Sequence, residues 1–262
     1  MVAFLSVLFV AAGFLSMSLA VEAAGSDTNS QEIDCFRRTA INRKEDCELA
    51  ISKIQYQRDN TLDTASKHFG WASGNCSVIV LNPDGATTTK EQIHKGFNQI
   101  LDQCKPHGGE GNPTSSDGIF LHIGTRSNAS YAPYESDFPF LYPTCGINKN
   151  APDIRVEDCK RAYNDITLDG SGVFPSQGNQ QAPSVTNTYQ SCTVMIYTSD
   201  DSTLLATKGN LNDIFGKMLG RCNGKSGVVS VKEGAQGLNG RVYLKIRSSI
   251  PCGFGPGKQV CH

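Results

Sequence analysis

Apolar residues form two kinds of pattern along this chain, continuous runs and helical spacing, and both patterns occur twice in the same order. Residues 76–81 and 192–198 are runs of β-branched and other apolar residues, which predict buried strands. Each run is followed by apolar residues at helical spacing, which predict amphipathic helices. These residues are Ile93, Phe97, Ile100 and Leu101 in the first copy, and Leu211, Ile214, Phe215 and Met218 in the second. The pattern therefore predicts a duplicated unit that mixes helices and strands.

The other expected elements complete each copy. Asp46 stands where a helix N-cap belongs, and Thr88 or Thr89 can cap the helix that contains Ile93. Helices are expected at residues 47–58, 158–166 and 210–221, and strands at residues 118–125, 227–231 and 241–247, with residues 203–207 as a hairpin partner of the strand 192–198. Residues 70–74 and 170–189 are expected to be loops because they are rich in glycine, proline and polar side chains.

Cysteines mark the same duplication. Cys35, Cys47, Cys76 and Cys104 recur in the same order and at similar spacing as Cys145, Cys159, Cys192 and Cys222. The predicted fold class is α+β: two tandem two-layer sandwiches, each with two helices on a small antiparallel sheet, stabilised by disulfides. We expect a first unit at residues 25–126, a linker at 127–143 and a second unit at 144–262.

Ten cysteines are an even number, which favours disulfides in an oxidising compartment. If the two helices of a unit run antiparallel, the start of the first lies near the end of the second. This geometry pairs Cys47 with Cys104 and Cys159 with Cys222. Elimination then pairs Cys35 with Cys76, Cys145 with Cys192 and Cys252 with Cys261. If the strand 76–81 has no hairpin partner, Cys76–Cys104 becomes the better pairing.

The N-terminus predicts secretion. Residues 2–20 are almost wholly apolar and are followed by small residues, which is typical of a signal peptide spanning residues 1–24. An uncleaved anchor is the alternative, because the apolar stretch could just span a bilayer. No later segment is long and apolar enough to cross a membrane, so we expect no membrane span after cleavage.

The charge balance and the absence of common motifs argue against several classes of function. With 24 Lys+Arg against 25 Asp+Glu and no basic block, a nucleic-acid partner is not expected. The histidines are scattered, so no metal site or cofactor is predicted. Residues 220–226 are one residue short of a phosphate-binding loop, and no Gly-x-Ser-x-Gly motif occurs. We expect no enzyme; a secreted hydrolase using, for example, His122 with Glu110 or Asp117 is a third hypothesis.

Exposed aromatic rings beside polar groups are suited to stacking on sugars. Trp71 in a glycine-rich stretch and Tyr131 and Tyr134 in the linker are the candidate carbohydrate-binding residues. Packing inside the protein is the competing interpretation. Asn75 and Asn128 lie in N-glycosylation sequons, so a glycoprotein is expected.

The cysteine skeleton resembles small secreted glycan-binding proteins of mushroom-forming fungi, and a similar skeleton occurs in fungal necrosis-inducing effectors and killer toxins with α/β sandwiches. The residues that carry it are Cys35, Asp46, Cys47, Ala50, Ile51, Cys76, Cys104, Gly108 and Gly109, with second-copy partners Cys145, Asp158, Cys159, Ala162, Cys192, Cys222 and Gly224. The resemblance implies a secreted, non-enzymatic, lectin-like protein whose partner is a glycan or cell-surface glycoconjugate. The alternative is an effector or killer-type toxin acting at a target cell surface. Neither ligand identity nor oligomeric state is predicted.

Overall fold

A computed structural model gives the fold of the chain. It describes residues 33–112, 118–126, 138–147, 151–170, 172–174, 182–249, 251–252 and 259–260. The expected signal peptide and most of the expected linker lie outside these residues. Across the described ranges, no helix is both long enough and apolar enough to span a membrane.

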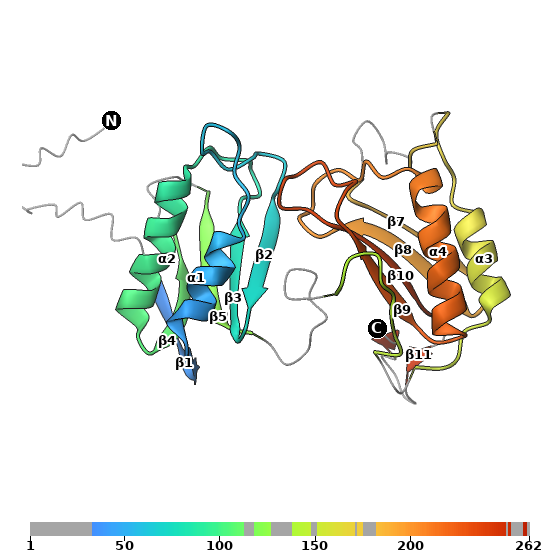
Figure 1. The fold of residues 1–262 in the computed structure, drawn as a ribbon, viewed down its shortest axis with the longest axis horizontal. Helices are drawn as coiled ribbons and strands as arrows, with labels where there is room; N and C mark the ends of the chain where they lie inside the picture. Colours follow the sequence, from blue (N-terminus) through green and yellow to red (C-terminus); the bar gives the residue numbers. More distant parts are fainter. Residues whose placement is uncertain are drawn as a thin grey trace, which may run out of the picture. The chain divides into compact units, whose positions relative to one another are not determined.

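The first sandwich is a five-stranded antiparallel sheet with two helices on one face (Figure 1). Its elements are β1 (Ile33–Ala40), α1 (Lys44–Ser52), β2 (His68–Ser73), β3 (Cys76–Leu81), α2 (Lys90–Cys104), β4 (His107–Gly111) and β5 (Phe120–Thr125). The strand order across the sheet is β1-β4-β5-β3-β2. A buried apolar cluster fills the space between helices and sheet, with Val78, Phe97 and Leu121 among its fully buried members.

The second sandwich repeats this topology. Its elements are β6 (Thr144–Cys145), α3 (Val156–Asn164), β7 (Ser184–Tyr189), β8 (Cys192–Thr198), α4 (Lys208–Cys222), β9 (Gly227–Val231) and β10 (Val242–Ser248). The strand order β6-β9-β10-β8-β7 is the same order with equivalent strands. Its own core includes Val194, Leu211 and Leu244. A small hairpin, β11 (Pro251–Cys252) with β12 (Gln259–Val260), follows. The predicted α+β class with two disulfide-stabilised sandwiches is confirmed.

The same buried carboxylate fixes the same hairpin in each copy. Asp46 and Asp158 are buried in the first turn of α1 and α3. Oδ2 of Asp46 accepts the Asn75 backbone N–H at 3.1 Å, in the tight turn between β2 and β3. Oδ2 of Asp158 accepts the N–H and the hydroxyl of Ser191 at 3.2 and 2.6 Å. The prediction that Asp46 is a helix N-cap is therefore wrong, because α1 already begins at Lys44 and the Asp46 carboxylate binds the hairpin.

The disulfide pairing was predicted wrongly. The bridges are Cys35–Cys104 and Cys47–Cys76 in the first sandwich, and Cys145–Cys222 and Cys159–Cys192 in the second. The two helices of a unit do not meet at their ends, because α1 packs on β2 and β3 whereas α2 packs on β4, β5 and β1. Each helix is therefore tied to a strand beneath it and not to the other helix. The predicted Cys252–Cys261 bridge stays a prediction, because Cys261 lies outside the described residues.

Several element predictions also need correction. α1 and α3 begin and end earlier than expected, and β1, β2, β4 and β7 form where loops or no elements were expected. Residues 203–207 are not a hairpin partner: β8 pairs with β7 and β10, and Thr207 caps α4 through its hydroxyl. The glycine equivalent to Gly109 is Gly227, not Gly224, because these two residues occupy matching positions against β5 and β10.

Candidate functional site

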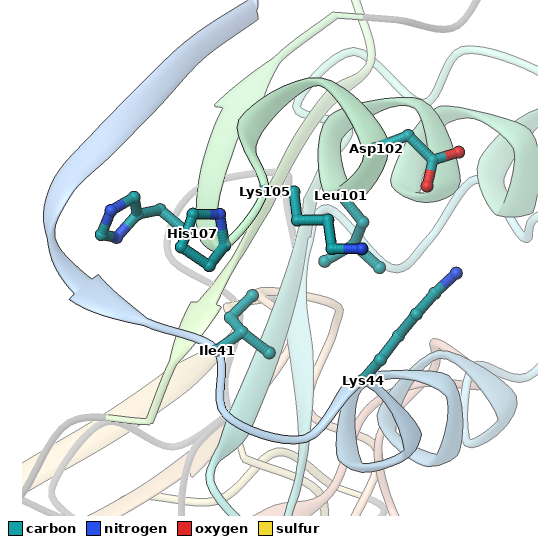
Figure 2. Close-up of a pocket in the computed structure, with 7 residues that line it drawn as sticks. Ile41, Lys44, Leu101, Asp102, Lys105 and His107 are labelled. Carbon is teal, nitrogen blue, oxygen red and sulfur yellow. The ribbon is translucent and has the colours of Figure 1, made fainter.

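A pocket lies at the C-terminal end of α2 in the first repeat (Figure 2). Its volume is about 130 Å³, and it is lined by Ile41, Lys44, Leu101, Asp102, Lys105, Pro106 and His107. Two links hold its parts together. The Cys35–Cys104 disulfide ties β1 to the end of α2, and the Ile41 N–H donates to the Pro106 carbonyl at 2.8 Å. Segments distant in sequence thereby form one concave surface.

The local sequence explains why α2 ends at this point and leaves residues 105–107 beside its last turn. Thr89 and Gln92 form a capping box that fixes the start of α2. The helix ends at Cys104, and Lys105 has an extended backbone because it precedes a proline. The chain then enters β4 at His107. The side chains of residues 105–107 are therefore displayed beside the last turn of α2.

The pocket combines an apolar floor with charged groups. Ile41, Leu101 and Pro106 supply the apolar surface. Lys44, Lys105 and Asp102 extend around the open side, and the His107 imidazole points away from them (Figure 2). Lys44 Nζ also lies 3.9 Å from Glu48 Oε1, with both side chains more than half exposed. The lining side chains carry two ammonium groups and one carboxylate, and the Glu48 carboxylate beside Lys44 offsets part of that positive charge.

The second repeat keeps the scaffold and not the charges. Aligning the disulfide cysteines places Val156, Gly220 and Asn223 at the positions of Lys44, Asp102 and Lys105. Leu219 matches Leu101, so part of the apolar floor persists. The three charged side chains of the pocket are therefore not repeated at the matching positions of the second repeat.

The predicted carbohydrate-binding residues are not all visible. Tyr131 and Tyr134 lie outside the described residues. Trp71 lies in β2, is partly buried against the first core, and donates from its indole N–H to Asn239 Oδ1 at 3.2 Å. The Arg241 guanidinium carbon is 4.8 Å from the Trp71 ring centroid. Trp71 stays a predicted sugar contact, but its N–H and one ring face are already engaged by the second repeat.

Of the two predicted glycosylation sites, only one lies within the described residues. Asn128 lies outside the described residues, whereas Asn75 is exposed in the β2–β3 turn. Ser77 of the same sequon is buried in β3 and Cys76 is in a disulfide. An attached glycan at Asn75 stays a prediction.

His122 and Glu110 do come together, on the sheet face opposite the helices. Nδ1 of His122 lies 3.0 Å from Glu110 Oε2, and the Phe36 ring centroid is 4.8 Å from the imidazole. The equivalent positions in the second sheet are Lys245 and Val228. Within the described residues, no hydroxyl or thiol is hydrogen-bonded to this imidazole. Among the described residues, therefore, no nucleophile is coupled to this pair. Asp117, the other predicted partner, lies outside the described residues.

Metal ligation finds no support in the described ranges, where no group of three or more His, Cys, Asp or Glu side chains could hold an ion.

The second sheet carries a lysine whose pKa is shifted. Burial lowers the pKa of Lys245, and the positive charge of Arg247 lowers it further. Lys245 is paired with Met195 and Val228 on the neighbouring strands, so no carboxylate faces it across the ladder.

Sequence reasoning missed the pocket in the first repeat. Lys105-Pro106-His107 directly after a half-cystine is a visible helix stop, but nothing in the sequence places Lys44 beside it. The correct pairing of Cys35 with Cys104 is a signal that points to it, because it ties β1, which precedes Ile41 and Lys44, to the end of α2.

Comparison with known proteins finds only weak structural similarity. No family model matches the chain, and no curated protein matches it. Among solved structures, the chain is similar to two tandem DUF26 ectodomains of Arabidopsis thaliana cysteine-rich receptor-like proteins. For PDLP8 the identity is 11%, the TM-score is 0.28, and 84% of this chain and 98% of that chain are covered. For PDLP5 the identity is 12%, the TM-score 0.26, and the coverage 83% and 98%. TM-scores this low carry no argument about function.

Proposed function

We propose that this is a secreted, non-enzymatic carbohydrate-binding protein whose first repeat binds an acidic saccharide. One observation carries the proposal: Lys44, Lys105 and Asp102 surround an apolar floor in the pocket at the end of α2. A pyranose ring has an apolar C–H face, which the floor can cover. Its hydroxyls can donate to Asp102, and a sugar carboxylate can accept from both ammonium groups.

The dimensions suit one face of a sugar residue. About 130 Å³ equals the share of roughly four liquid waters, so the pocket can cover part of one ring while the rest of the glycan stays outside. Both lysines and Asp102 are exposed. Salt therefore screens the attraction, and the affinity should fall as ionic strength rises.

Two further observations support the remaining parts of the proposal. Four disulfides in the described chain fit an oxidising compartment, as does the apolar N-terminal segment. The Glu110–His122 pair lies on the sheet face away from the helices, so it is not part of the pocket. We expect chain recovered from the medium of expressing cells to begin between residues 21 and 25, which N-terminal sequencing checks.

The decisive experiment compares two ligands that differ by one group. Methyl glucuronide and methyl glucoside are titrated into the mature, oxidised protein by calorimetry or NMR. The glucuronide should bind more tightly, and Lys44→Ala or Lys105→Ala should each weaken it about tenfold, since a hydrogen bond to a charged group contributes about 1.5 kcal/mol at the low end. Lys95→Ala is the matched control, because Lys95 is exposed on the same helix and does not line the pocket.

Equal binding of the two glycosides would rule out recognition of the carboxylate. An equal loss of affinity in the Lys95 variant would assign the effect to net charge and not to the pocket. Release of methanol from either glycoside would contradict the non-enzymatic part of the proposal.

A further inference from the structure

The two sheets have four edge strands, and three of them are protected against pairing with another chain. β1 has a register irregularity between Cys35 and Ala40 and carries the exposed Arg37 and Arg38. β6 has only two residues. At β2, the His68 N–H donates to the Asp200 carbonyl and Lys53 Nζ donates to the Ala72 carbonyl. Bulges, charges, short length and covering groups are the devices that protect sheet edges.

β7 has none of these devices. Its six residues, Ser184–Tyr189, contain no charge and no proline. They pair with β8 without interruption, from Ser184 opposite Tyr197 to Tyr189 opposite Cys192. This strand is therefore a regular, uncharged and exposed edge.

The register shows which backbone groups point away from the sheet. The Thr198 N–H donates to the Pro183 carbonyl at 2.9 Å, so Pro183 and Thr198 form a hydrogen-bonded pair. Such pairs alternate along an antiparallel ladder, so Val185, Asn187 and Tyr189 direct their N–H and C=O groups to β8. The backbone groups of the residues between them point outward, at Ser184, Thr186 and Thr188. Within the described residues these outward groups have no hydrogen-bond partner, and all three side chains are exposed.

We propose that β7 pairs antiparallel with β7 of a second copy of this chain, about a two-fold axis at Thr186. That register places Thr186 opposite Thr186 of the second copy, and Ser184 opposite Thr188. Each outward residue then meets an outward residue, and each pair exchanges two backbone hydrogen bonds. The cross-strand neighbours are β-branched or hydroxyl side chains, which pair favourably on a sheet.

The charges around the edge also suit a second copy. α3 packs over β7 and β8, so the α3 helices of two copies become neighbours in this arrangement. Its acidic residues, Glu157 and Asp158, equal its basic residues, Lys160 and Arg161. Within one chain, Lys160 pairs with Glu157, and Arg161 pairs with Asp165 just beyond the helix. Like charges therefore do not oppose the two-fold approach, and the inference is independent of what the pocket binds.

Sedimentation equilibrium of the mature, oxidised chain tests the pairing over a concentration series. The wild type should show a concentration-dependent mass of two protomers. Thr186→Pro removes an outward N–H and no bond to β8, so the dissociation constant should rise about 30-fold through the two lost hydrogen bonds. Thr186→Lys should have at least the same effect, because a lysine on an edge strand opposes pairing with another chain. Ser52→Lys, at the exposed end of α1, is the control and should dimerise like the wild type.

Hydrogen exchange locates the interface. Amides of Ser184, Thr186 and Thr188 should be protected at high protein concentration and exchange rapidly when diluted, whereas Val185 and Asn187 should be protected throughout. A wild type that stays monomeric at all concentrations overturns the proposal. So does a dimer that survives both Thr186 substitutions, or a monomer whose outward amides are protected by another segment of the same chain.

Discussion

Replacing Gly227 by alanine should destabilise the second repeat by about 1–2 kcal/mol. Gly227 opens β9 opposite Cys145 and Ile246, and an added Cβ would lie 2.5 Å from Cys222 Sγ and 3.4 Å from Met218 Cγ. Ordinary carbon contacts lie at about 3.5–4.0 Å, so the overlap with the sulfur is about 1 Å. That sulfur is tied to Cys145 and cannot simply swing away.

The magnitude follows from two opposing terms. Overpacking a close-packed site costs about 1–3 kcal/mol. Alanine restricts the unfolded chain more than glycine does, which returns about 0.4–1 kcal/mol. Gly216→Ala in α4 is the matched control: a Cβ there meets nothing within 4 Å, and the helix should gain about 1 kcal/mol. The same substitution should thus change the free energy of unfolding in opposite directions at two sites of one repeat.

Chemical denaturation of the oxidised protein measures both variants. A double-mutant cycle then tests the cause, because in a Cys145→Ala/Cys222→Ala background the sulfur is gone and Gly227→Ala should no longer destabilise. Should Gly227→Ala be as stable as the wild type with its disulfide intact, steric exclusion by the sulfur would not be the reason for glycine here. An unchanged penalty in the Cys145→Ala/Cys222→Ala background would point to the backbone of β9 instead.

Two further predictions concern the pH dependence of stability and helix capping. Burial raises the pKa of Asp200 above its ordinary 3.8, against the opposing hydrogen bonds from Ser202 and Ser66, and the neighbouring Asp63 carboxylate raises it further. Because the folded state then holds the proton more tightly than the unfolded state, this residue stabilises the fold most below pH 3.8. That contribution is lost as the pH rises through the folded pKa, with a slope of at most about 1.4 kcal/mol per pH unit. Asp200→Asn should remove it, as urea unfolding at several pH values would reveal; an unaltered slope would exclude Asp200 as its source. Thr89→Ala should cost about 1 kcal/mol by removing the cap on Gln92 N–H of α2, whereas Thr89→Ser should retain most of it, and equal losses in thermal unfolding would contradict this role.

The duplication and the main elements could be predicted because their signals are local. The apolar stripe of Ile93, Phe97 and Ile100 predicts α2, and the β-branched run in residues 76–81 predicts β3, whatever surrounds them. β4 could not be predicted in this way. Its sequence His-Gly-Gly-Glu-Gly has little strand preference, and Gly109 is present because a Cβ there would lie 2.7 Å from Cys104 Sγ.

β7 is a second strand that the sequence alone did not predict. Its Ser and Asn residues favour turns whereas its Val, Thr and Tyr residues favour strands, so the local signal is mixed and the pairing with β8 decides it. The pocket is likewise a product of packing, because Ile41 and Lys44 meet Lys105 through the pairing of β1 with β4 and the Cys35–Cys104 bridge.

By itself the sequence determined that one module occurs twice, that each copy mixes helices with strands, and that cysteines recur in register within it. These properties depend on periodicity and spacing, which are contained in short stretches of chain. Only the tertiary structure decided which cysteines are bonded, which glycines face sulfur, and which charges share a pocket. Those outcomes depend on the strand over which each helix packs, and that contact forms between residues far apart in the chain.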